Sequence, residues 1–159
     1  MNHFHALIQR FRFNDKALAA TVEGFTEDDW RRRASPDSSH AFWLLGHIAL
    51  TRRILFRKLG GDMTTAPWES AFAKGSKALD GDFVVSPEIL RADFAESGRR
   101  LEARLSALTA EDAAAPYGRT FPDGSSTIEG AAHFLYWHES YHLGQIGLLR
   151  RVCGKPGLA

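Results

Sequence analysis

Four long stretches of the chain repeat apolar residues at intervals of three and four positions, the spacing that forms one face of an α-helix. They span residues 4–22, 41–59, 87–108 and 128–152. A helix with one apolar face must bury that face, and four such helices can do so by packing on one another. The pattern therefore predicts an all-α fold, a four-helix bundle.

Residues typical of helix starts precede three of these stretches. Ser39 is expected to cap the second helix, Ser86 stands before the third, and Ser126–Glu129 forms a capping-box pattern before the fourth. Residues 61–86 have only weak periodicity and are expected to form a long connection between the second and third helices. That length suits a bundle with one crossover connection rather than a simple up-and-down topology.

The two halves of the sequence resemble each other. Thr26 followed by Asp29, and Thr109 followed by Asp112, each predict a short capped helix after a long one. A Pro-Asp turn then precedes the next long helix in both halves. These similarities suggest pseudo-symmetric helix pairs, although such signals also arise independently in unrelated segments.

Length and charge are those of an ordinary globular domain. The 159 residues are 44% hydrophobic and 25% charged, and we expect residues 1–159 to form a single domain. Lys and Arg total 20 against 19 acidic residues. Arginine pairs such as Arg52-Arg53 are interleaved with acids or lie near helix ends, so we expect them on a solvated face. The pattern lacks the concentrated basic patch of a nucleic-acid-binding surface.

No apolar run approaches the length of a membrane span, and the first residues lack the pattern of a secretion signal. The single cysteine, Cys153, excludes an intramolecular disulfide and suits a reducing compartment. We therefore expect a cytoplasmic protein that acts on a small molecule and binds neither nucleic acid nor a membrane.

The fourth apolar stretch contains His138-Glu139-Ser140-Tyr141-His142, an H-E-x-x-H pattern. Residues four apart lie on one face of a helix, so both imidazoles can bind one divalent ion if a third ligand comes from elsewhere. His47, on the apolar face of the second stretch, is the candidate third ligand. Burying three imidazoles is unfavourable unless each finds a partner, which favours a metal site of His47, His138 and His142. The alternative is a bundle whose histidines bind nothing.

Two neighbours of the ligands are candidate catalytic residues. Glu139 occupies the position of the general base in H-E-x-x-H metalloproteases, or it forms a salt link with an arginine. Gln145 lies near the same face and could donate to a ligand or substrate, or line a polar pocket. Peptidase activity is not expected, because no extended strand is predicted to bind a peptide.

The remaining histidines are not expected to be ligands. His133 lies about 140° round the helix from His138. The other three lie near helix starts and are expected to be exposed: His3, His5 and His40. Cys153 is several turns from His142 and is interpreted as an inert residue at a helix end.

These motifs resemble the DinB/YfiT-like superfamily of metal-binding four-helix bundles. The matching residues are Leu45-Gly46-His47-Ile48 and His138-Glu139-Ser140-Tyr141-His142-Leu143-Gly144-Gln145-Ile146. The family triad corresponds to His47, His138 and His142. Members commonly carry a further histidine where this chain has Tyr141, a position that is not a ligand.

Characterised relatives in that family include thiol-dependent S-transferases and a mycothiol-dependent isomerase. The resemblance implies a divalent ion, Zn²⁺ or Ni²⁺ by its imidazole donors, together with a low-molecular-weight thiol in transferase or hydrolase-like chemistry. The alternative is a non-catalytic metal-binding or stress-response protein with a structural ion. The catalytic and the structural site differ in whether the ion has an open coordination position that faces a cleft.

A homodimer is also expected. Relatives in the family often form dimers, and the apolar faces of the four predicted helices do not obviously bury Trp43, Trp68 and Phe72. Large apolar groups left outside a core commonly mark an interface, and a two-fold dimer is the commonest closed assembly.

Overall fold

The computed structural model describes residues 3–76 and 81–157. All the regular secondary structure of these residues is helical. The elements are α1 (His5–Thr21), α2 (Glu27–Arg31), α3 (Ala41–Lys58), the 3-10 helix η1 (Glu69–Phe72), α4 (Pro87–Ala107), α5 (Ala110–Ala114) and α6 (Ile128–Val152). Extended pairing in these residues is limited to an isolated bridge between Pro116 and Thr127. The predicted all-α class is confirmed.

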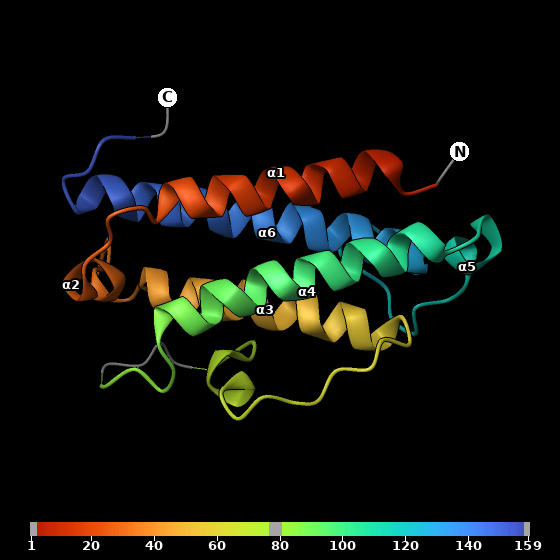
Figure 1. Ribbon diagram of the computed structural model, residues 1–159, viewed down its shortest axis with the longest axis horizontal. Coiled ribbons are helices and arrows are strands. Elements are labelled where there is room, and N and C mark those ends of the chain that lie inside the picture. Colours follow the sequence, from red (N-terminus) through yellow and green to blue (C-terminus); the bar gives the residue numbers. More distant parts are fainter. Residues whose placement is uncertain (1–2, 77–80, 158–159) are drawn as a thin grey trace.

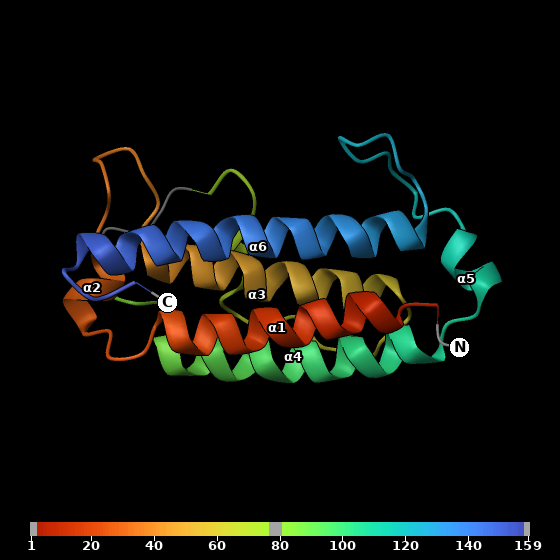
Figure 2. The ribbon, with the colours of Figure 1, turned by 90° about the horizontal axis from the view of Figure 1, so that it is seen from above.

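The four long helices, α1, α3, α4 and α6, lie side by side along the long axis of the molecule (Figures 1 and 2). Contacts join α3 to α4, α4 to α1, α1 to α6 and α6 to α3, so each long helix packs against two others. The short helices α2 and α5 lie at opposite ends (Figure 1). The connection that follows α3 returns along it, and η1 packs against α3.

The short helices begin as the sequence predicts. Thr26 accepts a hydrogen bond from the backbone N–H of Asp29, whose carboxylate accepts one from the backbone N–H of Thr26. Thr109 and Asp112 form the same reciprocal pair at α5. The order of a long, a short and a long helix therefore occurs twice, with the same cap at each short helix.

Two other predicted caps were wrong by one position. The cap of α6 is Thr127 and not Ser126. At α3 the cap is His40 rather than Ser39, because the Nδ1 atom of His40 accepts a hydrogen bond from the backbone N–H of Trp43 at 3.0 Å. This role buries His40, which is 2% exposed, so its expected exposure was also wrong.

Polar residues lie between two apolar clusters of the core. The cluster near α2 includes Trp30, and the cluster near α5 includes Ala113. At the middle of the long helices, buried polar side chains replace apolar ones: Asn14, Arg52, Ser97 and Glu139. We call these four residues, together with Asp15, the central polar layer.

Arg52 holds the central polar layer together. Its guanidinium donates to Glu139 at 2.5 and 2.9 Å, to Asp15 at 2.5 Å and to the backbone carbonyl of Phe94 at 3.0 Å. The side chain is 0% exposed, so the prediction of a solvated Arg52-Arg53 pair was wrong. The sequence alone could not reveal acidic partners on two other helices.

The aromatic residues that suggested an interface belong to the core. Trp43, Trp68 and Phe72 are 9%, 8% and 0% exposed, because the segment around η1 folds back onto α3. They therefore cannot mark a dimer surface.

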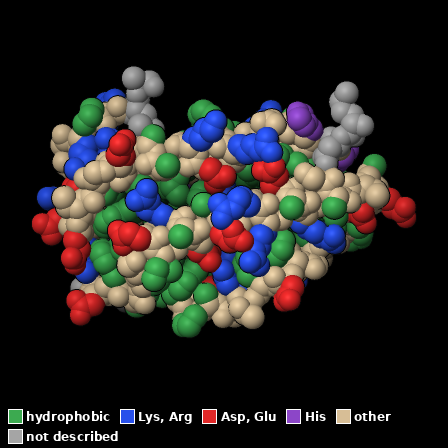
Figure 3. All heavy atoms as spheres, in the orientation of Figure 1, with side chains coloured by type: hydrophobic (Ala, Val, Ile, Leu, Met, Phe, Trp, Pro, Cys, Tyr) green, Lys and Arg blue, Asp and Glu red, His purple; other side chains and the backbone are tan. Residues whose placement is uncertain are grey.

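Charges of both signs are interspersed over the face of the molecule drawn in Figure 3. None of the described helices combines the length and the apolar character needed to cross a lipid bilayer.

Candidate metal centre

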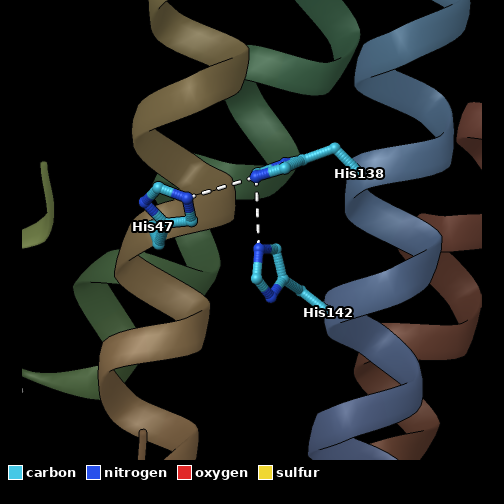
Figure 4. Close-up of side chains that lie close together, drawn as sticks. All are labelled: His47, His138 and His142. Carbon is cyan, nitrogen blue, oxygen red and sulfur yellow. Dashed lines mark hydrogen bonds between the residues drawn. The ribbon is translucent and has the colours of Figure 1, made fainter. Parts of the chain in front are cut away.

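Three histidines from two helices meet between α3 and α6. His47 comes from α3, and His138 and His142 come from successive turns of α6 (Figure 4). The Nε2 atom of His138 lies 3.1 Å from the Nε2 atom of His47 and 3.1 Å from that of His142. Candidate ligand atoms of all three lie within 4.8 Å of one another. The structure thus brings together the three histidines nominated by sequence.

Hydrogen bonds fix the tautomers of two of these rings. The Nδ1 atom of His47 lies 2.8 Å from the backbone carbonyl of Phe72, and that of His142 lies 2.6 Å from the Oε1 atom of Gln145. A carbonyl oxygen can only accept, so both Nδ1 atoms carry the proton. The Nε2 lone pairs of His47 and His142 therefore point toward His138.

Burial keeps the triad neutral. It lowers the pKa of His47 and His142. At His138, burial together with the neighbouring His142 and His47 lowers the pKa to about 3. A metal binds the lone pair of a neutral imidazole, so these rings can act as ligands at neutral pH without first losing a proton.

The two Nε2–Nε2 distances at His138 suit a shared divalent cation. Zinc–nitrogen bonds are about 2.0–2.1 Å long, so two nitrogens on one ion, at angles between octahedral and tetrahedral, lie about 2.8–3.4 Å apart. The two distances of 3.1 Å fall in that range. Without a cation, a single N–H of His138 would have to serve both neighbouring lone pairs, and the Nδ1 atom of His138 has no hydrogen-bond partner among the described residues.

The carbonyl that orients His47 is held by an ion-pair cluster. Phe72 ends η1, and Glu69 begins it. The Glu69 carboxylate accepts hydrogen bonds from Arg53 at 2.6 Å and from Arg57 at 2.8 and 2.9 Å, both on α3. The connection after α3 is thereby fixed to the helix that carries His47.

A cavity of about 440 Å³ opens beside the triad. Helices α3 and α6 form its long walls, while residues after η1 and residues between α5 and α6 complete the lining. All three histidines line it, so an ion that they held would face the cavity.

The sequence pattern of the DinB superfamily matches residues 10–146. The chain belongs to the DinB superfamily. A solved structure described as a conserved protein from Enterococcus faecalis aligns with a TM-score of 0.74 and 17% sequence identity. The alignment covers 98% of this chain and 99% of that chain, and at this identity it shows a shared fold only. No curated protein matches the chain.

In this DinB-superfamily chain, Glu139 lies on a different side of α6 from the triad. Its carboxylate is 0% exposed, forms an ion pair with Arg52 and accepts a hydrogen bond from Asn14 at 3.3 Å. Glu139 does not line the cavity. The structure therefore favours the salt link that the sequence left as the alternative to a general base.

Gln145 does reach the triad, through His142. Its Oε1 atom accepts from the Nδ1 atom of His142, and its side chain does not line the cavity. His133 is exposed and is not part of the triad. Its Nε2 atom lies 3.9 Å from the Oε1 atom of Glu129. Cys153 is the C-cap of α6, and burial raises the pKa of its thiol, as suits an inert residue.

The Phe72 carbonyl is the functional group that sequence reasoning missed. It is a backbone atom in a segment of weak periodicity, so no side-chain pattern marks it. The one sequence signal was the aromatic pair Trp68 and Phe72 in an otherwise irregular connection.

Proposed function

We propose that this DinB-superfamily protein is a metal-dependent enzyme that transfers a low-molecular-weight thiol to an electrophile. His47, His138 and His142 would hold one divalent ion, Zn²⁺ or Ni²⁺, within a four-helix-bundle framework. One observation carries the proposal: the triad forms part of the wall of a cavity large enough for a small molecule. Structural zinc sites usually have four protein ligands, whereas catalytic sites have three and keep a position open.

The ion would supply Lewis acidity, which lowers the pKa of a thiol or water molecule beside it. A thiol is the better-supported nucleophile. Hydrolysis in H-E-x-x-H enzymes uses the glutamate as a base, but Glu139 is paired with Arg52, and no Asp or Glu in the described part of the chain lines the cavity. A thiol, with a pKa of about 8.5, needs less help than water, at about 15.7.

In the transfer, the thiol sulfur forms a bond to an electrophilic carbon of the substrate, and the leaving group departs with the bonding electrons. The thiol proton passes to solvent. Gln145 acts as a positioning residue, because its contact sets the tautomer of His142. Cys153 lies outside the cavity lining, so the thiol must be diffusible.

Cobalt-substituted protein tests the proposal. Adding a small thiol should produce a sulfur-to-metal charge-transfer band, and the protein should conjugate that thiol to an electrophile above the uncatalysed rate. His138→Ala should abolish both signals, while His133→Ala, on the same helix and exposed, should retain them. A protein that binds one equivalent of cobalt but shows neither the charge-transfer band nor conjugation would support the alternative. In that case the ion is structural, in a non-catalytic metal-binding or stress-response protein.

A further inference from the structure

The two ends of the cavity differ in polarity. On α3, the residues that line the cavity continue from His47 to Leu55. On α6, they continue from His138 toward the start of the helix, through Leu135 to Ala131. The two helices run in opposite directions, so these paths lead to the same end of the cavity (Figures 1 and 2). The triad forms a polar end of the cavity, and toward the other end α3 and α6 contribute aliphatic side chains, Leu55, Leu135 and Ala131.

Two cationic side chains, Lys74 and Arg119, also line the cavity. Lys74 comes two residues after Phe72, whose carbonyl contacts His47, so it enters near the polar end. Neither cation forms an ion pair with a carboxylate in the described part of the chain. The cavity thus has positive charges that its own walls do not neutralise.

A series of ring contacts positions Arg119. Its guanidinium carbon lies 4.4 Å from the centroid of the Phe121 ring, and Phe121 packs on Phe134 with centroids 5.0 Å apart. Phe134 in turn stacks on His138 at 6.1 Å. Arg119 therefore lines the cavity from the segment between α5 and α6.

Backbone hydrogen bonds brace that segment. The N–H of Tyr117 donates to the carbonyl of Ser126 at 2.8 Å, and the N–H of Phe121 donates to the carbonyl of Ser125 at 2.8 Å. Arg119 thus stands on a hydrogen-bonded loop, which reduces the entropy lost when it binds a ligand.

We propose that the cavity takes a substrate with an apolar body and a carboxylate group. The body lies among Phe134, Leu135 and Ala131, and the carboxylate meets Arg119 and Lys74. Three neutral imidazoles would leave the charge of a bound ion uncompensated, which adds to the attraction for an anion. Calling this ligand a substrate rests on the proposed function, but its binding does not.

Phenylbutyrate and its uncharged amide form a matched pair of probes, equal in size and different in charge. Titration calorimetry should show that the acid binds more tightly than the amide. Arg119→Gln should weaken the binding of the acid about fivefold, as expected for loss of one exposed ion pair, and should leave the binding of the amide unchanged. Arg119→Lys should largely restore acid binding. The double variant Lys74→Gln/Arg119→Gln should remove the preference.

Arg100→Gln is the control, because Arg100 pairs with Glu96 on α4 and does not line the cavity. It should bind both probes as the parent protein does. Equal binding of acid and amide by the parent, equal weakening of both by Arg119→Gln, or failure of both to bind would overturn the proposal.

Metal content measured on the same samples separates this inference from the proposed function. A full equivalent of metal with no preference for the acid would defeat the inference alone. A preference for the acid that persists in chelator-treated protein and is lost in Arg119→Gln would support the inference, even if no variant of the triad changed metal binding.

Discussion

The ring of Phe72 occupies the space that a side chain at Gly46 would need: a Cβ atom there would lie 2.3 Å from the Cδ1 atom of Phe72. Phe72 also offers its carbonyl to the Nδ1 atom of His47, one residue along α3. Gly46→Ala should therefore displace Phe72 and weaken the hydrogen bond that orients His47. Loss of such a contact typically lowers metal affinity about 10- to 100-fold. Competition against a zinc chelator would measure this.

Gly147→Ala provides the control for that experiment. Gly147 lies within α6, and a Cβ atom built there meets nothing within 4 Å. The substitution should stabilise the protein by about 0.5–1 kcal/mol through reduced backbone entropy, without changing metal affinity. Equal metal affinities of the Gly46 variant and the parent would show that the Phe72 contact does not support the site.

Stoichiometric metal binding should depend on each histidine of the triad. His47→Ala, His138→Ala and His142→Ala should each lose the ion from protein purified without a chelating tag, as measured by elemental analysis. A chelator should lower the melting temperature of the parent, because an ion bound only to the native state stabilises it. His133→Ala should behave as the parent does. Retention of a full equivalent by all three triad variants would exclude the site.

Glu139→Ala should destabilise the fold. It leaves the guanidinium of Arg52 buried without its main partner, which typically costs about 3–5 kcal/mol in the free energy of unfolding. Urea denaturation would measure the loss. The double variant Arg52→Met/Glu139→Leu should recover much of it, because neither charge remains. Full stability of the single variant with loss of catalysis would restore Glu139 as a general base.

Acid should weaken the attachment of η1. Burial alone would raise the pKa of Glu69, but hydrogen bonds from Arg57, the backbone of Ala66 and Arg53 outweigh it and lower the pKa to about 2. Because the folded pKa lies below the unfolded value of 4.5, this carboxylate stabilises the protein fully above pH 4.5. That stabilisation is lost as the pH falls from 4.5 toward 2.

Glu69→Gln should lower the free energy of unfolding at neutral pH by about 1.5–3 kcal/mol, the range for hydrogen bonds to charged groups. The free energy of unfolding of this variant should also change less with pH below 4.5 than that of the parent. Urea melts of chelator-treated protein at several pH values would show both effects without interference from metal release. Glu23→Gln, at an exposed residue of a connecting segment, should leave the profile unchanged. If the free energy of unfolding of the Glu69 variant changed with pH in parallel with that of the parent, the prediction would be contradicted.

The expected homodimer should use the outer face of α6. Four apolar residues at helical spacing on that face are 44–57% exposed: Trp137, Tyr141, Leu148 and Val152. A second copy that packed there would bury them. Sedimentation at micromolar concentration should show a dimer for the parent and a monomer for Trp137→Glu, whereas Phe13→Glu on α1 should remain dimeric. A parent that sediments only as a monomer would exclude this assembly.

Local patterns were enough to predict the long helices and to select the three histidines. Apolar spacing depends on which face of a helix is buried, and the four-residue separation of His138 and His142 is a property of the helix itself. His47 could be paired with them because it also lies on an apolar face. Each of these inferences needs information from one segment only.

The partners of Arg52 and His47 could not be predicted in the same way. Arg52 and Glu139 are 87 positions apart and lie on different helices. Space for the guanidinium comes from Gly98, where a Cβ atom would lie 2.3 Å from the Nη1 atom of Arg52. An arginine beside another arginine therefore looked solvated, although the folded protein surrounds it completely.

Three consecutive residues of α6 point in three directions: Trp137 to solvent, His138 to the cavity and Glu139 to the core. Each step along the helix turns the side chain by about 100°. A residue gained or lost between the start of α6 and His138 would therefore rotate all three out of place together, carrying His138 away from His47 and the Glu139 carboxylate away from Arg52. Substitution can alter one of these directions at a time, but a change of length alters all of them. The number of residues in this helix is therefore constrained by all three contacts at once.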